Sequence, residues 1–218
     1  MGSEMCIRDS NGILFLDELP EFSRNALESL RQPTEEKQIV VSRAKYTARY
    51  PANFMLIASM NPCPCGYYNH PTRECVCSPG SVHRYMSRIS GPLMDRIDMH
   101  VEVTPVSAAE LSAAAPGESS AAIRARVVRA REVQAARFRC AQGVHTNAMM
   151  NAAMLREYCR PDAASAALLE RAMERLNLSA RAYDRILKVA RTIADLAGRD
   201  TVAAADVAEA INYLSLIH

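Results

Sequence analysis

Tryptophan is absent from this 218-residue sequence, and aromatic residues make up only 6% of it. No apolar run approaches the roughly 20 residues of a membrane-spanning helix, and no signal peptide is recognisable. The abundance of alanine, arginine and methionine favours helices over a sandwich of sheets. A net charge of +2 does not by itself indicate a nucleic-acid partner. We therefore expect a cytoplasmic globular protein that does not associate with membranes.

The seven cysteines are unevenly distributed, since four of them lie close together and the others are scattered. This pattern suits a reducing compartment better than the disulfide framework of a secreted protein. The arginines are also uneven, because six of them lie between residues 124 and 139. That strip is either a solvated helix face or a surface that faces a polyanion or another subunit.

The two ends of the sequence differ in character from the rest. Residues 5–10 and 214–218 read as a translated sequencing adapter and its reverse complement. We expect residues 1–10 and 214–218 to be such artefacts on a truncated gene fragment, and they are set aside in predicting the fold.

The remaining sequence divides into an α/β part and a helical part. The apolar runs at residues 12–16 and 54–60 are typical of buried parallel strands, and 99–103 is predicted to be a third strand. Helices are predicted at 23–30 and 81–89, and a hairpin at 38–50. We assign 11–106 to the distal part of an α/β core, 107–118 to a linker and 119–213 to an all-α part. Helices there are expected at 119–138, 151–159, 162–176, 179–197 and 203–213, with Ser179 as an N-cap and Gly198 as a stop.

The strongest chemical pattern is the acidic pair Asp17-Glu18 directly after the first strand. Ligands of α/β sheets bind at the carboxyl ends of strands. In a phosphate-binding ATPase the first acid holds the Mg²⁺ shell and the second polarises the attacking water. Two acids at the start of a helix, where they favour its dipole, are the alternative.

Two further residues extend this pattern. Asn61 ends the second strand, where an amide could bind a γ-phosphate or the attacking water, although Asn before Pro62 is also a common turn. Arg96 lies between Asp95 and Asp98, where it could stabilise a transferring phosphoryl group or form a surface ion pair.

The order and the amino-acid sequences of these motifs resemble those of the ComM/YifB family of magnesium-chelatase-like AAA+ ATPases. The resemblance rests on residues 12–22 (GILFLDELPEF), 50–66 (YPANFMLIASMNPCPCG), 90–103 (SGPLMDRIDMHVEV) and 177–198 (NLSARAYDRILKVARTIADLAG). It implies a partial P-loop NTPase sheet followed by a helical lid.

The resemblance also implies roles for individual residues. Asp17 and Glu18 match the Walker B acids, and Asn61 matches sensor 1. Arg96 matches the arginine finger, with Arg88 as the second candidate. Arg181 matches the sensor 2 arginine of the helical lid, and Arg185 is its alternative.

One element of the family is missing from the sequence, since no G-x-x-x-x-G-K-[ST] motif occurs. We expect the parent protein to use ATP and Mg²⁺ as a hexameric ring, and this fragment alone to be inactive. The resemblance implies DNA remodelling during natural transformation. A magnesium-chelatase motor subunit and a non-enzymatic assembly module are the alternatives. The cysteine loop favours the first function, because chelatase motor subunits lack it.

Two more groups of residues suggest binding sites. Cys63, Cys65, Cys75 and Cys77 form two C-x-C pairs that could supply four thiolates to Zn²⁺, with His70 or His83 as substitutes, or could remain metal-free. Arg43 and Lys45 lie at the predicted hairpin tip, which is either a solvated turn or a contact for DNA phosphates.

Overall fold

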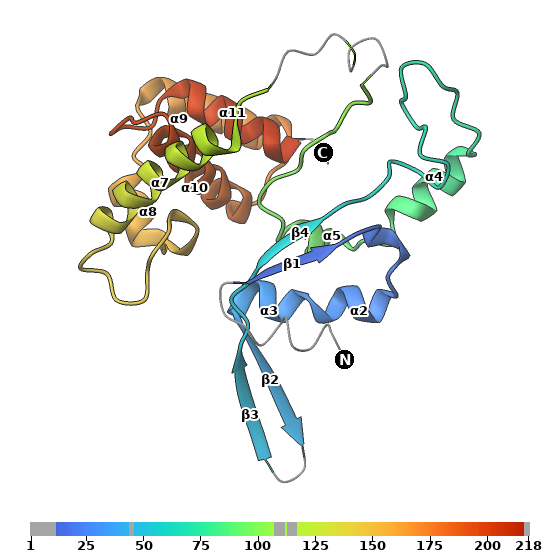
Figure 1. Cartoon of the computed structure of the whole chain (residues 1–218), viewed down its shortest axis with the longest axis horizontal. Helices are drawn as coiled ribbons and strands as arrows, with labels where there is room; N and C mark the ends of the chain where they lie inside the picture. Colours follow the sequence, from blue (N-terminus) through green and yellow to red (C-terminus); the bar gives the residue numbers. More distant parts are fainter. Residues whose placement is uncertain (1–11, 44–45, 107–111, 113–116, 216–218) are drawn as a thin grey trace. The chain divides into compact units, whose positions relative to one another are not determined.

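The computed structural model describes residues 12–43, 46–106, 112 and 117–215. The chain divides into two compact units, Met1–Ile97 and Asp98–His218, which we describe separately (Figure 1). The first unit contains the described strands, and the second is helical. A small parallel sheet followed by a helical region confirms the predicted fold class.

The centre of the first unit is a pair of parallel strands. β1 (Ile13–Leu16) pairs with β4 (Met55–Ala58), so that Ile13 lies opposite Met55 and Leu16 opposite Ala58. Both strands are short apolar runs, as expected for a parallel sheet. Because parallel strands end at the same edge, the residues that follow Leu16 and Ala58 lie next to one another.

Only one face of this strand pair is covered by described residues. Leu14, Leu16 and Ala58 pack against a core formed by Leu19, Leu27, Leu30, Ile89 and Leu93. The opposite face exposes Ile13, Phe15, Met55 and Ile57, of which Ile13 is 62% exposed. The expected burial of these strands therefore holds for one face only among the described residues, because the helices of this unit cover one face.

The helices of the first unit are short. They are η1 (Leu19–Glu21), α2 (Arg24–Ser29), α3 (Arg31–Glu36), α4 (Pro79–Met86) and α5 (Gly91–Met94). The Ser23 side chain accepts a hydrogen bond from the Ala26 amide, and Ser78 accepts one from the Ser81 amide. Each serine therefore satisfies an unpaired amide in the first turn of its helix. The patterns had not predicted α3 and α5 as separate helices.

The predicted hairpin is confirmed. β2 (Gln38–Arg43) pairs antiparallel with β3 (Tyr46–Pro51), with Val40 opposite Arg49. It extends from the end of α3 as a two-stranded ribbon (Figure 1).

The third predicted strand is wrong. Residues 99–103 belong to no strand, and Val101 and Val103 are 66% and 86% exposed. The His100 amide donates to the Tyr213 carbonyl. Apolar alternation alone does not make a strand, because a strand also needs a neighbour with which to form a ladder.

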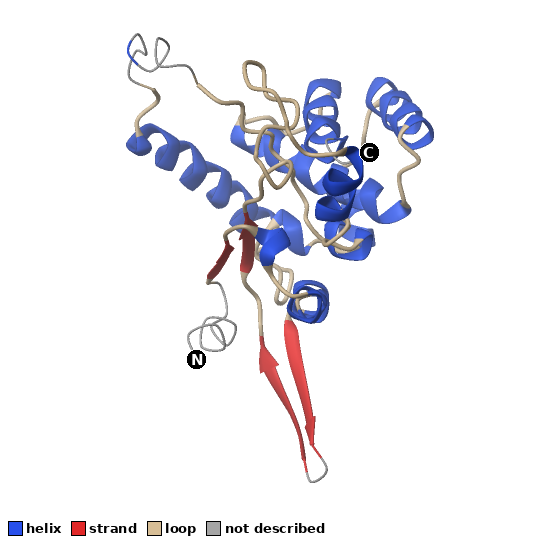
Figure 2. Cartoon of the chain, turned by 90° about the vertical axis from the view of Figure 1, so that its right-hand side faces the viewer, coloured by secondary structure: helices blue, strands red, loops and turns tan. Residues whose placement is uncertain are grey.

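The second unit is built from helices, and all of those named here except η2 closely match the predicted ranges (Figure 2). They are α7 (Ser120–Arg137), η2 (Asn147–Met149), α8 (Ala152–Tyr158), α9 (Ala163–Arg175), α10 (Ala180–Leu196) and α11 (Ala204–Ser215). Ser179 caps α10 by accepting from the Ala182 amide, and Gly198 follows that helix with a φ of +69°. Both roles were predicted. No described helix has the length and apolarity needed to cross a membrane.

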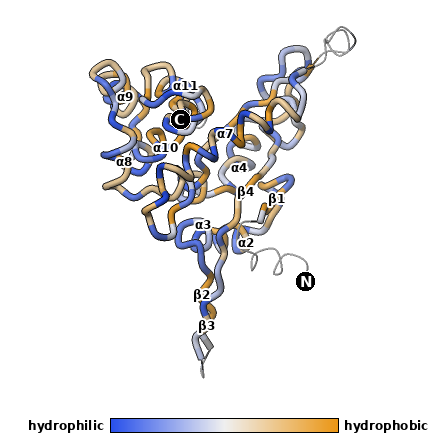
Figure 3. Tube along the Cα trace, turned by 60° about the vertical axis from the view of Figure 1, so that its left-hand side comes forward, coloured by the Kyte–Doolittle hydropathy of each residue, from blue (hydrophilic) through white to orange (hydrophobic). Residues whose placement is uncertain are grey.

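The core of this unit forms around α10. Ile186, Ala190 and Ala194 are fully buried along one face of that helix, and the hydropathy colouring shows apolar segments on it (Figure 3). α11 adds Val207, Ala210 and Leu214. Leu214 had been set aside in the prediction, but it is only 2% exposed in this core.

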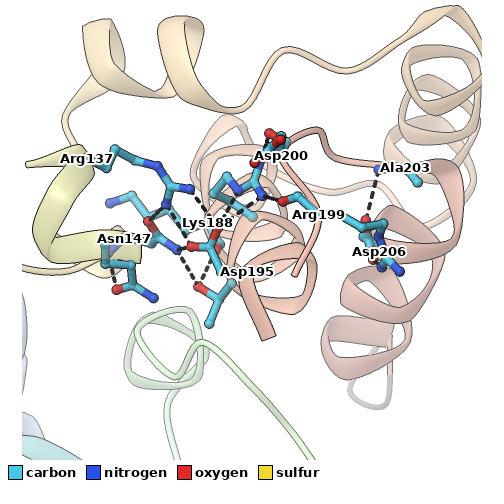
Figure 4. A network of polar contacts seen from close by, with 11 residues as sticks. Arg137, Asn147, Lys188, Asp195, Arg199, Asp200, Ala203 and Asp206 are labelled. Carbon is cyan, nitrogen blue, oxygen red and sulfur yellow. Dashed lines mark hydrogen bonds and ion pairs between the residues drawn. The ribbon is translucent and has the colours of Figure 1, made fainter. Parts of the chain in front are cut away.

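A buried carboxylate, Asp195, joins four segments of the helical unit (Figure 4). Arg137 donates to both of its oxygens, at 2.6 and 2.7 Å, and Asn147 donates at 2.8 Å. Arg191 donates at 3.0 Å and also reaches the carbonyl of Asp200. Arg137 therefore belongs to the interior of this unit, and neither alternative given for the arginine strip applies to it.

Opposing effects set the pKa of Asp195. Burial would raise it, but the hydrogen bonds from Arg137 and Asn147 and the two guanidinium charges bring it below the ordinary value. A carboxyl whose pKa is lowered by folding stabilises the fold above its unfolded pKa. That stabilisation is lost as the pH falls through the folded pKa.

Asp195→Ala should destabilise the helical unit strongly, because it removes the carboxylate that balances the charges of Arg137 and Arg191 within the unit. We expect a loss of roughly 3–5 kcal/mol in the free energy of unfolding, measured by urea denaturation and circular dichroism. The control is Arg126→Ala, which removes an exposed pair with Glu118 and should cost less than about 1 kcal/mol. Equal losses in the two variants would contradict the structural importance of Asp195.

Candidate functional site

The acidic pair and the asparagine lie at the same edge of the sheet. Asp17 and Glu18 follow β1, and Ser59 leads from β4 toward Asn61. The Ser59 hydroxyl donates to the Asp17 carboxylate, and the Ser59 amide donates to the Leu16 carbonyl at 2.9 Å. The structure thus places the two strand ends next to one another.

Glu18 has a backbone conformation that is unusual for its residue type. Its φ and ψ are 51° and 50°, in the left-handed region, and its amide donates to Asp17 Oδ1 at 3.1 Å. A residue other than glycine in this region costs about 1–3 kcal/mol, and such strain is found at functional sites. The side chains of Asp17 and Glu18 are both exposed. The turn therefore presents two carboxylates to solvent at the end of the sheet.

Asn61 is exposed beside a buried tyrosine from α4. Tyr85 is 6% exposed and shares a hydrogen bond with the Asn61 backbone. Burial raises the pKa of Tyr85, the Glu21 carboxylate adds to that effect, and the hydrogen bond opposes it. Tyr85 is thus a neutral side chain that joins α4 to the segment that follows β4.

Sequence reasoning missed Ser59, the residue that links Asp17 to β4. Leu16 lies opposite Ala58, so the next residues along the two strands are Asp17 and Ser59. A polar residue one place beyond the apolar run was the available indication.

The two arginine-finger candidates have different environments. Arg96 is 12% exposed on its side chain, and it donates to the Glu35 carboxylate and the Pro92 carbonyl. Arg88 is 51% exposed, and it donates to the Pro20 carbonyl at 3.1 Å and to Glu21 at 3.0 Å. Glu35 was not predicted as a partner, because it lies 61 residues from Arg96 in the sequence.

The basic residues of α10 also differ in their availability. Arg191 is 1% exposed and bound within the Asp195 network, while Lys188 donates to the Ala148 carbonyl at 3.0 Å. Arg185 is 9% exposed, whereas the side chain of Arg181 is exposed in the first turn. Of these four residues, Arg181 has the most exposed side chain.

The four clustered cysteines are brought together in one loop, and we refer to them as the cysteine cluster. Its members are Cys63, Cys65, Cys75 and Cys77, and their sulfur atoms lie within 4.8 Å of one another. Cys63 is fully buried, and no described histidine joins the group. The Tyr67 backbone amide lowers the pKa of Cys65 to about 6. Four sulfurs at this spacing match the donor set of a thiolate metal site.

The hairpin residues proposed to meet DNA are only partly described. β2 ends at Arg43, whose backbone pairs with Tyr46, and Lys45 lies outside the described residues.

Two family models match the chain, and together they cover most of its length. Residues 5–111 match the family described as "Magnesium chelatase, subunit ChlI", and residues 117–214 match its C-terminal counterpart. The chain belongs to the ComM/YifB family of magnesium-chelatase-like AAA+ proteins. The resemblance stated from the motifs is therefore confirmed.

The relatives include proteins from several bacteria. The chain is 42% identical over 209 residues to the competence protein ComM of Haemophilus influenzae, covering 95% of this chain and 40% of that protein. It is equally identical to YifB of Escherichia coli, over 94% of this chain and 40% of the relative. The Rv2897c protein of Mycobacterium tuberculosis is 42% identical over 206 residues, with 94% and 40% coverage. The chain thus spans about two fifths of the length of these relatives.

Proposed function

We propose that the full-length protein is a ring-forming ATPase, and that this chain carries the acidic pair with which it hydrolyses ATP. The observation that carries the proposal is the exposed, left-handed turn of Asp17 and Glu18, which Ser59 joins to the end of β4. Carboxylates at the end of a parallel strand are suited to act on a nucleotide triphosphate. Membership of an AAA+ family supports the same reaction.

The two acids would act differently on the reaction. Asp17, oriented by the Ser59 hydroxyl, would hold the magnesium shell, because carboxylate oxygens are preferred Mg²⁺ ligands. Glu18 would orient and polarise the attacking water. Asn61 would donate its side-chain amide to the γ-phosphate or to that water.

The exposed oxygen donors at this turn fit Mg²⁺, which when bound neutralises charge on the phosphate oxygens. This chain contains no G-x-x-x-x-G-K-[ST] motif, and we propose that the phosphate-binding loop comes from another part of the full-length protein. We propose that the chain alone does not hydrolyse ATP.

Arginines from two places would complete the site. We propose Arg96 as the finger that acts on the nucleotide of a neighbouring subunit in a hexamer, positioned by Glu35. Arg181, in the first turn of α10, would contact the nucleotide of its own subunit. Arg88 and Arg185 remain the respective alternatives.

The proposed substrate is DNA, which the ring would remodel at branched junctions during natural transformation. Identity to a protein named for competence supports this assignment. Arg43, the last residue of β2, and Lys45, two residues further along the sequence, would contact phosphates without sequence preference. Insertion of magnesium into a porphyrin is the second candidate, supported by the description of the matching family.

Glu18→Gln in the full-length protein should abolish turnover while preserving nucleotide binding. The amide keeps the shape of the side chain and loses the charge that polarises water, so we expect a decrease of about 10²–10⁴-fold in ATP hydrolysis. Retention of radiolabelled ATP in isolated rings would report binding. Turnover close to that of the unmodified protein would remove Glu18 from the mechanism.

Arg96→Ala should be rescued in mixed rings. We mix the Arg96→Ala protein with a variant in which the lysine of the phosphate-binding loop is replaced. One kind of subunit interface then carries both an intact phosphate-binding loop and an intact Arg96, so we expect ATPase activity to reappear. Arg88→Ala is the comparison, and it should retain activity by itself. Rescue of Arg88→Ala with no rescue of Arg96→Ala, when both assemble, would reassign the finger to Arg88.

Removal of the hairpin charges should weaken DNA binding most at low salt. For Arg43→Ala combined with Lys45→Ala, each lost phosphate contact should reduce the slope of log K against log salt by roughly 0.7–0.9. Fluorescence anisotropy with labelled DNA would measure it. The control, Arg156→Ala with Arg160→Ala, removes the same charge from the helical unit. Equal slopes in the two double variants would contradict a DNA contact at the hairpin.

A further inference from the structure

The loop between β4 and α4 has almost no apolar core. Residues 59–78 form neither helix nor strand, and Cys63 is the only buried residue among them. The apolar side chains of Tyr68 and Val76 are 46% and 85% exposed. Apolar packing therefore does not determine the course of this loop. The four cysteine side chains lie together within it, and that of Cys63 is buried.

The separations between the sulfurs agree with those around a metal ion. The Sγ atom of Cys63 lies 3.4 Å from that of Cys65 and 3.7 Å from that of Cys75, and the latter two are 3.6 Å apart. Zn²⁺ bound tetrahedrally, with Zn–S bonds of about 2.3 Å, holds its sulfurs roughly 3.8 Å apart. These four cysteines are free thiols, so the spacing is not that of disulfides.

The backbone is shaped to bring the two pairs together. The Gly66 amide donates to the Cys63 carbonyl at 3.0 Å, and Gly66 has a φ of +81°. This turn folds the chain back after Cys65. A second turn contains Asn69, whose φ is +58°. Both positions adopt the left-handed conformation that tight turns require.

His70, the histidine of this loop, bonds to neighbouring loop residues and does not belong to the cysteine cluster. His70 Nδ1 accepts the amides of Thr72 and Arg73, at 3.2 and 3.1 Å, and its ring packs edge-on to Tyr67. Arg73 donates to the Tyr67 hydroxyl and lies over its ring. These residues therefore bond to one another, and the candidate metal ligands are the four cysteine sulfurs without a histidine.

We propose that the cysteine cluster binds one Zn²⁺ ion in a closed structural site that fixes the loop between β4 and α4. Four sulfur ligands leave no open position for a substrate, so the ion acts as a cross-link and not as a catalyst. The cross-link joins Cys63, two residues after Asn61, to Cys77, one residue before Ser78, which caps α4. It would thereby hold the start of α4 close to the end of β4. This proposal does not depend on ATP hydrolysis.

Metal analysis of the 218-residue chain, purified without chelators, tests the proposal. We expect one zinc per chain by mass spectrometry of the elements. Cys63→Ser combined with Cys75→Ser should contain none, whereas the control Cys140→Ser, which alters an exposed cysteine outside the loop, should retain one. Iron in place of zinc, or equal zinc in both variants, would overturn the proposal.

A measurement on the unmodified chain avoids variants that fail to fold. Alkylation followed by peptide mass spectrometry should modify the cysteine cluster at least tenfold faster after treatment with a chelator. Cys140 should react at the same rate with and without the chelator. Unchanged rates in the cluster, or disulfides between its members, would show that no metal holds the loop.

Discussion

The parallel pairing of β1 with β4 determines where the candidate site lies. Leu16 pairs with Ala58, and the register continues to Asp17 and Ser59, whose side chains are joined by a hydrogen bond. A shift of one residue would move Ser59 away from Asp17 and would turn Leu14 and Leu16 out of the core. The core on one face of the strands thus stabilises the same register that assembles the polar edge.

Polar groups have opposite roles in the two units. In the helical unit, Asp195 is fully buried and its oxygens are satisfied by arginine and asparagine donors, so its charge stabilises the packing of the helices. At the sheet edge, Asp17 and Glu18 are exposed, and Glu18 has a strained backbone. A satisfied buried charge contributes to structure, whereas an exposed carboxylate on a strained turn is available for a ligand.

The loop that follows Asn61 connects the candidate site with the cysteine cluster. Asn61 is held by Tyr85 from α4, and the loop from Cys63 to Cys77 leads directly into that helix. A cross-link within the loop would limit the motion of both its ends, because each end is within two residues of a ligand. The position of an exposed asparagine is then supported by a buried tyrosine on one side and by the loop on the other.

Local patterns were sufficient to predict β1, β4, the hairpin and α7 to α11, because strand and helix periods and serine caps depend on neighbouring residues. They also pointed to Asp17, Glu18 and Asn61. The third strand was wrong because a ladder needs a neighbouring strand, and no described strand pairs with residues 99–103. Tertiary structure alone revealed the partners of Asp17, Arg96 and Asp195, which are 42, 61 and 58 residues away. Contacts at such separations depend on strand register and helix packing, which no short stretch of sequence contains.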